Sequence, residues 1–181
     1  MLLKTSSGSK LIISDEDRRE IVMVCLENGT KLNNRYTIVN RLSDTSFVVN
    51  YAGFDEIQRR ECCIAEFFLR YGTYRNRLDG MVQALTSAKQ KKVNIYITKY
   101  KRMVDILTML QYEGIVPEVY DVFSQNNTYY CVMEYIHGQS MEELIERNGG
   151  ILSLEYVKFI ALNAGNALIK TFPNYGTIQS T

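Results

Sequence analysis

The sequence YYCVMEYIHGQSMEE, residues 129–143, places a strand, a short linker and a helix start in direct succession. Residues 129–135 are aromatic or apolar except for one glutamate, which is typical of a strand within a sheet. Ser140, with Glu143 three residues later, predicts a capping box, in which both side chains satisfy free amides at the start of a helix. Gly149-Gly150 predicts the end of that helix.

Four more strands are expected before this segment. Residues 125–128, Gln-Asn-Asn-Thr, predict a tight hairpin turn, because asparagine tolerates the backbone angles that such a turn needs. The turn connects the strand at 129–135 to one over Val119–Ser124. Short polar turns separate three earlier strand-like runs, which predict an antiparallel meander: Arg35–Leu42, Phe47–Phe54 and Glu61–Phe68.

Two longer helices are predicted from the spacing of apolar residues. Residues 95–112 form an amphipathic pattern whose apolar side is Tyr100, Met103, Val104, Leu107 and Leu110. The polar stretch 69–93 before it is expected to be a long loop with at most one helical turn. A last helix is expected to begin after Ser153 and to end at Pro173, with a single apolar stripe: Leu154, Val157, Ala161, Ala164 and Leu168.

The N-terminal residues have two interpretations. The runs Lys10–Ser14 and Ile21–Leu26, the second closed by Asn28-Gly29, predict a β-hairpin, and their β-branched content favours it. A helix that begins at Ser14 is the alternative, because acidic residues follow that serine directly.

The composition argues against several classes of protein. The chain has 181 residues, 46% of them hydrophobic, and a net charge of +1, so no overall field would draw it to nucleic acid or to an anionic membrane. The longest apolar run, Ile21–Leu26, is far shorter than the roughly 20 residues of a membrane-spanning helix. We therefore expect a soluble, cytoplasmic protein that binds neither nucleic acid nor a membrane.

The content of cysteine and histidine argues against metal and hydrolytic sites. The four cysteines form no CxxC pair, so neither a zinc site nor a disulfide framework is expected. A single histidine, His137, removes most histidine-based triads. Glu66 and Asp105 could form a carboxylate pair for a metal, but they lack supporting ligands. No metal site is predicted.

The order of these elements resembles the small lobe and first large-lobe helices of eukaryotic-type protein kinases, in the form found in bacterial serine/threonine kinases. Residues 62–68, CCIAEFF, are similar to the third-strand motif Val-Ala-Ile-Lys followed by a glutamate and aromatics. Residues 119–123 and 126–128 are similar to the fourth strand and its turn, and residues 132–140 to the fifth strand and the hinge. The resemblance covers residues 32–176.

The resemblance implies an α+β fold, with a five-stranded antiparallel sheet and one helix similar to αC, followed by two helices similar to αD and αE. Three segments are then expected along the chain. They are an N-terminal extension over residues 1–33, a kinase-like N-lobe over 34–136, and a hinge with a two-helix tail over 137–181.

The resemblance also implies that a phosphate-binding loop has been lost. The three glycines of the family's G-x-G-x-x-G motif fall on Ser43, Thr45 and Val48. Side chains at these positions obstruct the close approach of backbone amides to phosphate. Asp44 adds a negative charge, and only Phe47, the aromatic residue at the loop tip, is retained.

Other nucleotide-site positions are also changed. The lysine that holds the phosphates aligns with Ala65, and the helix glutamate that orients it aligns with Asp105, so their ion pair cannot form. Met133 aligns with the position that gates the adenine pocket, and Tyr135 lies in the hinge. The His-Arg-Asp motif becomes Gln179-Ser180-Thr181, and the chain stops before the magnesium ligands. The resemblance therefore implies no catalytic residue and neither ATP nor magnesium as cofactor.

We therefore expect a catalytically inactive, pseudokinase-like regulatory or protein-interaction module. In a complete kinase the helix equivalent to the last one is buried in the large lobe, so its apolar stripe is the candidate interface: Leu154, Val157, Ala161, Ala164 and Leu168. A second copy, a partner protein or a continuation of the chain would cover it. The alternatives are a truncated fragment of an ATP-dependent serine/threonine kinase and a nucleotide sensor without turnover.

Overall fold

The computed structural model describes residues 25–177, with side chains up to residue 169. The described chain forms two compact units. The first contains the strands and most of the long helix, as far as Ile106; the second contains Leu107–Glu118 and the chain from Ile136 onward. Except for its last two residues, the hairpin predicted at residues 10–26 lies outside the described residues, as does the segment 179–181.

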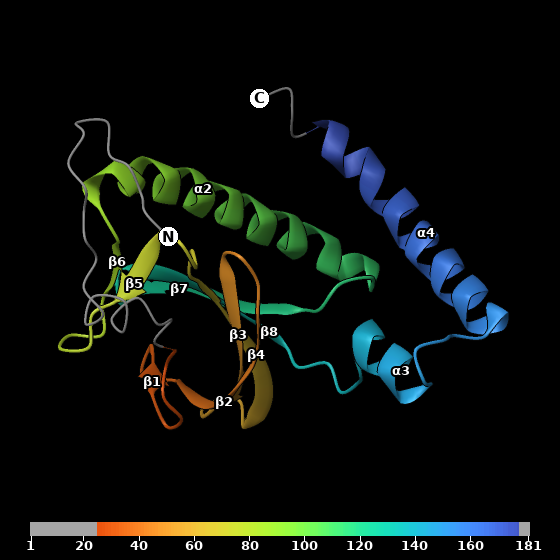
Figure 1. Ribbon diagram of the computed structural model, residues 1–181, viewed down its shortest axis with the longest axis horizontal. Coiled ribbons are helices and arrows are strands. Elements are labelled where there is room, and N and C mark those ends of the chain that lie inside the picture. Colours follow the sequence, from red (N-terminus) through yellow and green to blue (C-terminus); the bar gives the residue numbers. More distant parts are fainter. Residues whose placement is uncertain (1–24, 178–181) are drawn as a thin grey trace. The chain divides into compact units, whose positions relative to one another are not determined.

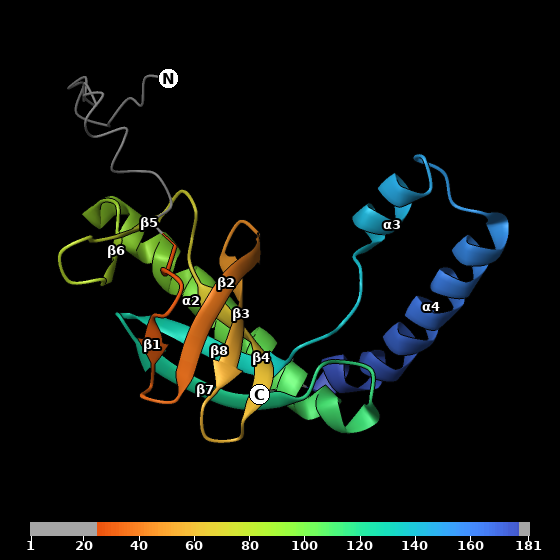
Figure 2. The same cartoon turned by 90° about the horizontal axis from the view of Figure 1, so that it is seen from below.

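Six antiparallel strands form the main sheet of the first unit, in the order β1-β2-β3-β4-β8-β7 (Figures 1 and 2). Their bounds are Lys31–Leu32 (β1), Tyr36–Asp44 (β2), Val48–Asp55 (β3), Arg60–Phe67 (β4), Val119–Gln125 (β7) and Thr128–Glu134 (β8). The predicted meander and the later hairpin are confirmed, and β1 is a short additional strand. Asn126 and Asn127 have φ values of 52° and 56°, the left-handed angles expected for the β7–β8 turn.

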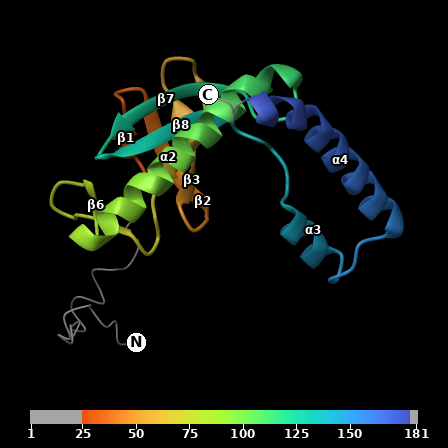
Figure 3. The same cartoon turned by 90° about the horizontal axis from the view of Figure 1, so that it is seen from above.

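The two faces of this sheet bury different sets of side chains, because successive residues of a strand point to opposite faces. On β4, Ile64 belongs to a cluster with residues of β2 and β3, whereas Ala65 and Phe67 belong to a second cluster. The helix α2, Ser87–Leu110, packs Tyr100 and Val104 into this second cluster. Figure 3 shows α2 lying across that face of the sheet.

The expectation of a loop over residues 69–93 is wrong. This stretch contains a hairpin formed by β5 (Thr73–Arg75) and β6 (Val82–Ala84), and α2 begins at Ser87, eight residues before the predicted start at residue 95. The first two turns of α2 place mainly lysine, glutamine and alanine at the surface, with Val93 as their buried residue. These residues favour a helix but give no apolar periodicity. A short 3-10 helix, Gln111–Glu113, follows α2.

The second unit contains α3 (Met141–Arg147) and α4 (Leu154–Thr177). The predicted capping box is confirmed: the Glu143 amide donates to Ser140 Oγ at 3.1 Å, and the Ser140 amide donates to the Glu143 carboxylate at 2.7 Å. The predicted end of the last helix at Pro173 is wrong, since α4 continues to Thr177. Proline removes one backbone donor, and a long helix accommodates that single loss. Within residues 25–177 no helix has the length and apolarity to span a membrane.

Candidate functional site

The turn between β2 and β3 occupies the place of the expected phosphate loop. The amides of Phe47 and Val48 donate to the hydroxyl of Thr45, at N–Oγ1 distances of 3.4 and 3.1 Å. The Ser43 hydroxyl accepts a bond from Asn50 Nδ2 at 3.1 Å. An anion-binding loop offers its backbone amides to the anion. Here two of these amides are bonded within the turn, to Thr45, the residue at the position expected for the middle glycine.

The same turn is held against the chain that follows β4. The amides of Phe68 and Arg70 donate to the carbonyls of Phe47 and Ser46, at 2.9 and 3.0 Å. The Asp44 carboxylate forms ion pairs with Arg41 and Arg70. The charge of Asp44 is therefore compensated by Arg41 of β2 and by Arg70, which follows β4, and the turn is fixed at several points.

Ala65, at the position of the expected lysine, is buried among apolar and aromatic side chains. It belongs to one cluster with Val48 and Tyr100, and the Tyr100 hydroxyl donates to the Ala65 carbonyl at 2.8 Å. Phe47 packs against Tyr96 of α2, with ring centroids 6.0 Å apart. The structure thus brings the predicted positions Val48 and Ala65 together, in a cluster of apolar and aromatic side chains.

Asp105 does not lie beside Ala65. It is exposed on α2, whereas Val104, the preceding residue, is buried in the cluster that holds Ala65, and Met103 packs against that cluster. Successive residues of a helix point about 100° apart, so Asp105 faces away from the sheet. Methionine and tyrosine therefore occupy the side of α2 that faces Ala65. Spacing in sequence alone does not reveal which face of the helix is buried.

The positions near the hinge lie on β8 or follow it. Met133 is half-buried against the cluster around Ala65 and is paired with Cys63 of β4, and Tyr135 is half-buried. Cys131 lies opposite Ala65, and burial raises the pKa of its thiol to about 12. A thiol with such a pKa is an inert apolar group at neutral pH.

The opposite face of the sheet contains a buried polar network that the sequence did not predict. The Glu66 carboxylate is fully buried and accepts bonds from Tyr130 Oη at 2.7 Å, Tyr51 Oη at 3.0 Å and Arg75 Nη2 at 2.5 Å. Burial, followed by the charge of Glu66, raises the pKa of both tyrosines, so they remain protonated donors. The only signal in the sequence is a glutamate among apolar residues in a predicted strand.

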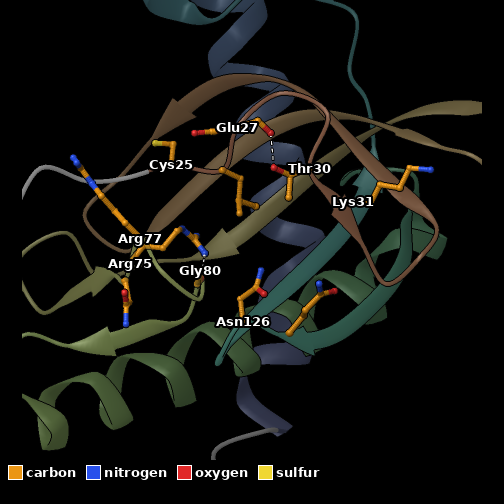
Figure 4. Close-up of a pocket in the computed structure, with 11 residues that line it drawn as sticks. Cys25, Glu27, Thr30, Lys31, Arg75, Arg77, Gly80 and Asn126 are labelled. Atoms are coloured by element: carbon orange, nitrogen blue, oxygen red, sulfur yellow. Dashed lines mark hydrogen bonds between the residues drawn. The ribbon is translucent and has the colours of Figure 1, made fainter.

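A pocket of about 530 Å³ lies above this network, between the segment 25–31, the β5–β6 hairpin and the β7–β8 turn (Figure 4). Arg75 forms part of its lining and also donates from Nη1 to the Gly80 carbonyl at 2.8 Å. Because Arg75 bonds both to Glu66 of the sheet and to Gly80 of the hairpin, it fastens the hairpin to the sheet. Glu66 lies on the face of the sheet opposite α2, whereas Asp105 is exposed on α2, so the structure does not bring these two carboxylates together. Residues 25–177 hold no group of three His, Cys, Asp or Glu side chains arranged for a metal.

The candidate interface residues lie on α4 in the second unit. Leu154 and Leu168 expose 68% and 61% of their surface, and Val157 exposes 46%. Ala161 and Ala164 are also exposed. The apolar stripe of α4 is therefore not covered by the described part of the second unit.

Together the first unit and its hinge define the class of fold, which is that of a protein-kinase small lobe. The solved structure PpkA-294, a kinase in its apo form, superposes with a TM-score of 0.63 at 18% identity, over 67% of this chain and 42% of that one. No protein-family model matches the sequence.

The sequence relatives are bacterial kinases. The chain is 26% identical over 123 residues to a probable serine/threonine-protein kinase of Clostridium acetobutylicum, and 27% identical over 121 residues to the serine/threonine-protein kinase PrkC of Bacillus subtilis. These matches cover 68% and 67% of this chain but only 16% of each relative. The expected resemblance to bacterial serine/threonine kinases and the expected α+β fold are confirmed.

Proposed function

We propose that this chain is a catalytically inactive, kinase-like module that regulates or binds another protein and uses neither ATP nor magnesium. The observation that carries the proposal is the bonding of the β2–β3 turn. Thr45 accepts from the two amides of Phe47 and Val48, and no lysine stands at position 65. A triphosphate would have to displace bonds within the turn and would gain no charged partner from β4.

The packing around Ala65 supports the same proposal. Val48, Ala65 and Tyr100 are buried in one apolar cluster, and Met103 and Phe47 pack against it. In a phosphate site, charged donors face the position of the anion. Here apolar and aromatic contacts replace them, which favours a structural role for this part of the lobe.

The protein-binding part of the proposal is supported by α4. Its stripe of Leu154, Val157 and Leu168 is exposed within the second unit. Leaving large apolar side chains in water costs roughly 1.5–3 kcal/mol for each one. We therefore propose the stripe as the contact for a partner protein or a second copy.

Calorimetric titration of ATP, with and without magnesium, tests the proposal. The chain and its Ala65→Lys variant are compared, with Ala65→Met as a control of similar bulk without a charge. We expect no measurable binding of ATP to any of the three proteins at ATP concentrations up to about 1 mM. A dissociation constant of about 1 mM corresponds to roughly 4 kcal/mol of binding free energy.

ATP binding that Ala65→Lys strengthens by more than roughly tenfold, and Ala65→Met does not, would contradict the proposal, because one charge-assisted contact is worth about that much. Such binding would favour the alternative that the chain is a fragment of an ATP-dependent serine/threonine kinase. Both bacterial relatives carry the name serine/threonine-protein kinase. Binding that is independent of the lysine would instead favour a nucleotide sensor.

A further inference from the structure

The helix α2 concentrates positive charge in a chain that is almost neutral overall. It contains six basic residues and one acidic residue, Asp105, whereas the whole chain has a net charge of +1. The basic residues are Lys89, Lys91, Lys92, Lys99, Lys101 and Arg102. Because five net charges lie along one helix, the local field differs strongly from that of the molecule as a whole.

The outward side of α2 combines these cations with an exposed aliphatic side chain. Lys91, Ile95 and Arg102 are separated by four and seven residues, so they lie on the same side of the helix. This side is opposite to the one that buries Val93 and Tyr100 against the sheet. Lys91 and Arg102 are exposed, and Ile95 exposes 56% of its surface. We call Lys91, Ile95 and Arg102 the outer face of α2.

Aromatic contacts hold further cations beside the outer face. The ammonium groups of Lys92 and Lys99 lie 5.8 and 5.3 Å from the centre of the Tyr96 ring. Tyr96 is itself packed against Phe47. Two long side chains are thereby partly ordered before any partner arrives, which reduces the entropy that binding would cost.

We propose that the outer face of α2 is a docking surface for an acidic segment of a partner protein, with an aliphatic side chain of that segment placed on Ile95. The partner's carboxylates pair with Lys91 and Arg102, and Lys92 and Lys99 extend the positive field that guides its approach. This surface belongs to a different helix from the stripe of α4, and the inference does not depend on whether the chain binds ATP.

The chemistry of the face favours a protein over the other polyanions. An exposed isoleucine between two cations fits an amphipathic peptide, which supplies both carboxylates and an apolar side chain. A membrane-binding helix needs a broad apolar face. The apolar face of α2 is already buried against the sheet, where Val93, Tyr100 and Val104 lie.

The test uses fluorescence anisotropy with the full chain and a defined probe. The probe is a fluorescein-labelled helical peptide of about 14 residues, roughly four turns, with glutamates spaced three or four residues apart around one leucine. Its control replaces every glutamate with glutamine. We expect the acidic probe to bind and the glutamine peptide to bind at least roughly tenfold more weakly, and binding of the acidic probe to weaken several-fold between about 0.05 and 0.5 M salt.

Charge-reversal variants locate the surface. Lys91→Glu with Arg102→Glu is expected to weaken probe binding by roughly tenfold or more, and Ile95→Ser by several-fold. The matched control is Arg77→Glu with Lys158→Glu, which makes the same change in net charge at exposed positions outside α2. It is expected to leave binding within about twofold, since neither position belongs to the outer face of α2.

Three results would overturn the proposal. The first is the absence of probe binding up to about 1 mM chain, because a dissociation constant above about 1 mM corresponds to a binding free energy weaker than about 4 kcal/mol. The second is an equal loss of binding in the α2 variant and in the control variant, which would indicate attraction by net charge alone. The third is tighter binding of a single-stranded RNA oligonucleotide or of phosphatidylserine vesicles through Lys91 and Arg102, which would assign the surface to a different class of partner.

Discussion

Glu66 on β4 and Arg75 on β5 form a buried ion pair, with 2.5 Å between Oε1 and Nη2. The carboxylate also accepts bonds from Tyr51 and Tyr130, so three side chains donate to it. Burial alone would lower the pKa of Arg75, but the adjacent Glu66 charge raises it overall, so the guanidinium remains charged. The pair joins the β5–β6 hairpin to the face of the sheet opposite α2, and it makes the stability of the lobe depend on two residues nine positions apart.

Removing one member of this pair should destabilise the first unit strongly. Arg75→Met leaves the Glu66 charge buried without its cation and is expected to cost roughly 3–5 kcal/mol in the free energy of unfolding. The double variant Arg75→Met with Glu66→Gln should cost less than Arg75→Met alone, because a neutral amide still accepts bonds from the tyrosines. Urea unfolding of the wild type, both single variants and the double variant measures this coupling. Strictly additive losses would show that the two residues do not act as a pair.

A second buried carboxylate should make the lobe sensitive to acid. Arg35 donates to both oxygens of Asp55, at 2.9 and 2.7 Å, and this bonding lowers the pKa of Asp55 below its usual value of 3.8. Because the pKa is lower in the folded state, the stabilisation is present above the unfolded-state pKa and is lost as the pH falls through the folded-state pKa.

Asp55→Asn is therefore expected to lower the free energy of unfolding by roughly 1–3 kcal/mol at neutral pH and to flatten its decline below about pH 4. Thermal unfolding at a series of pH values measures both effects. Glu56→Gln is the control, since Glu56 is the adjacent carboxylate on the surface. An unchanged acid profile in Asp55→Asn would contradict this account of Asp55.

The bonding of the β2–β3 turn predicts different effects for two substitutions of Thr45. Thr45→Val keeps the shape of the side chain but removes the hydroxyl that accepts from Phe47 and Val48, so we expect a loss of roughly 1 kcal/mol. Thr45→Ser retains the hydroxyl oxygen, so we expect it to lower the free energy of unfolding by only about a few tenths of a kcal/mol. Faster amide hydrogen exchange at Phe47 and Val48 in the valine variant alone would confirm the role of the hydroxyl, and equal exchange rates in both variants would refute it.

The capping box of α3 predicts a local effect in the second unit. Ser140→Ala removes the acceptor of the Glu143 amide and is expected to destabilise α3 by roughly 0.5–2 kcal/mol. Glu143→Gln should be close to neutral, because glutamine also completes a capping box. Hydrogen exchange at residues 141–147 compares the two variants. If they exchange at the same rate as the wild type, the box does not stabilise the helix.

Much of the fold follows from local sequence. The meander, the Asn126-Asn127 turn and the Ser140–Glu143 capping box were all predictable, because strand alternation, left-handed asparagines and helix caps depend on neighbouring residues. The start of α2 was not predictable, because the first turns of this helix place lysines at the surface and bury only Val93. The end of α4 at Thr177 does not follow from Pro173, since a proline does not always end a helix.

The sequence by itself determined the class of the fold and which residues stand where the resemblance expects the motif residues, namely Ser43, Thr45 and Val48 for the three glycines and Ala65 for the lysine, because these depend on positions in a linear motif. Only the tertiary structure showed that Tyr100 and Met103, and not Asp105, face Ala65. It also showed that Thr45 binds the amides of its own turn and that Glu66 is paired with Arg75. These relationships depend on which face of each helix and strand is buried and on contacts between segments distant in sequence, and neither is encoded in local patterns.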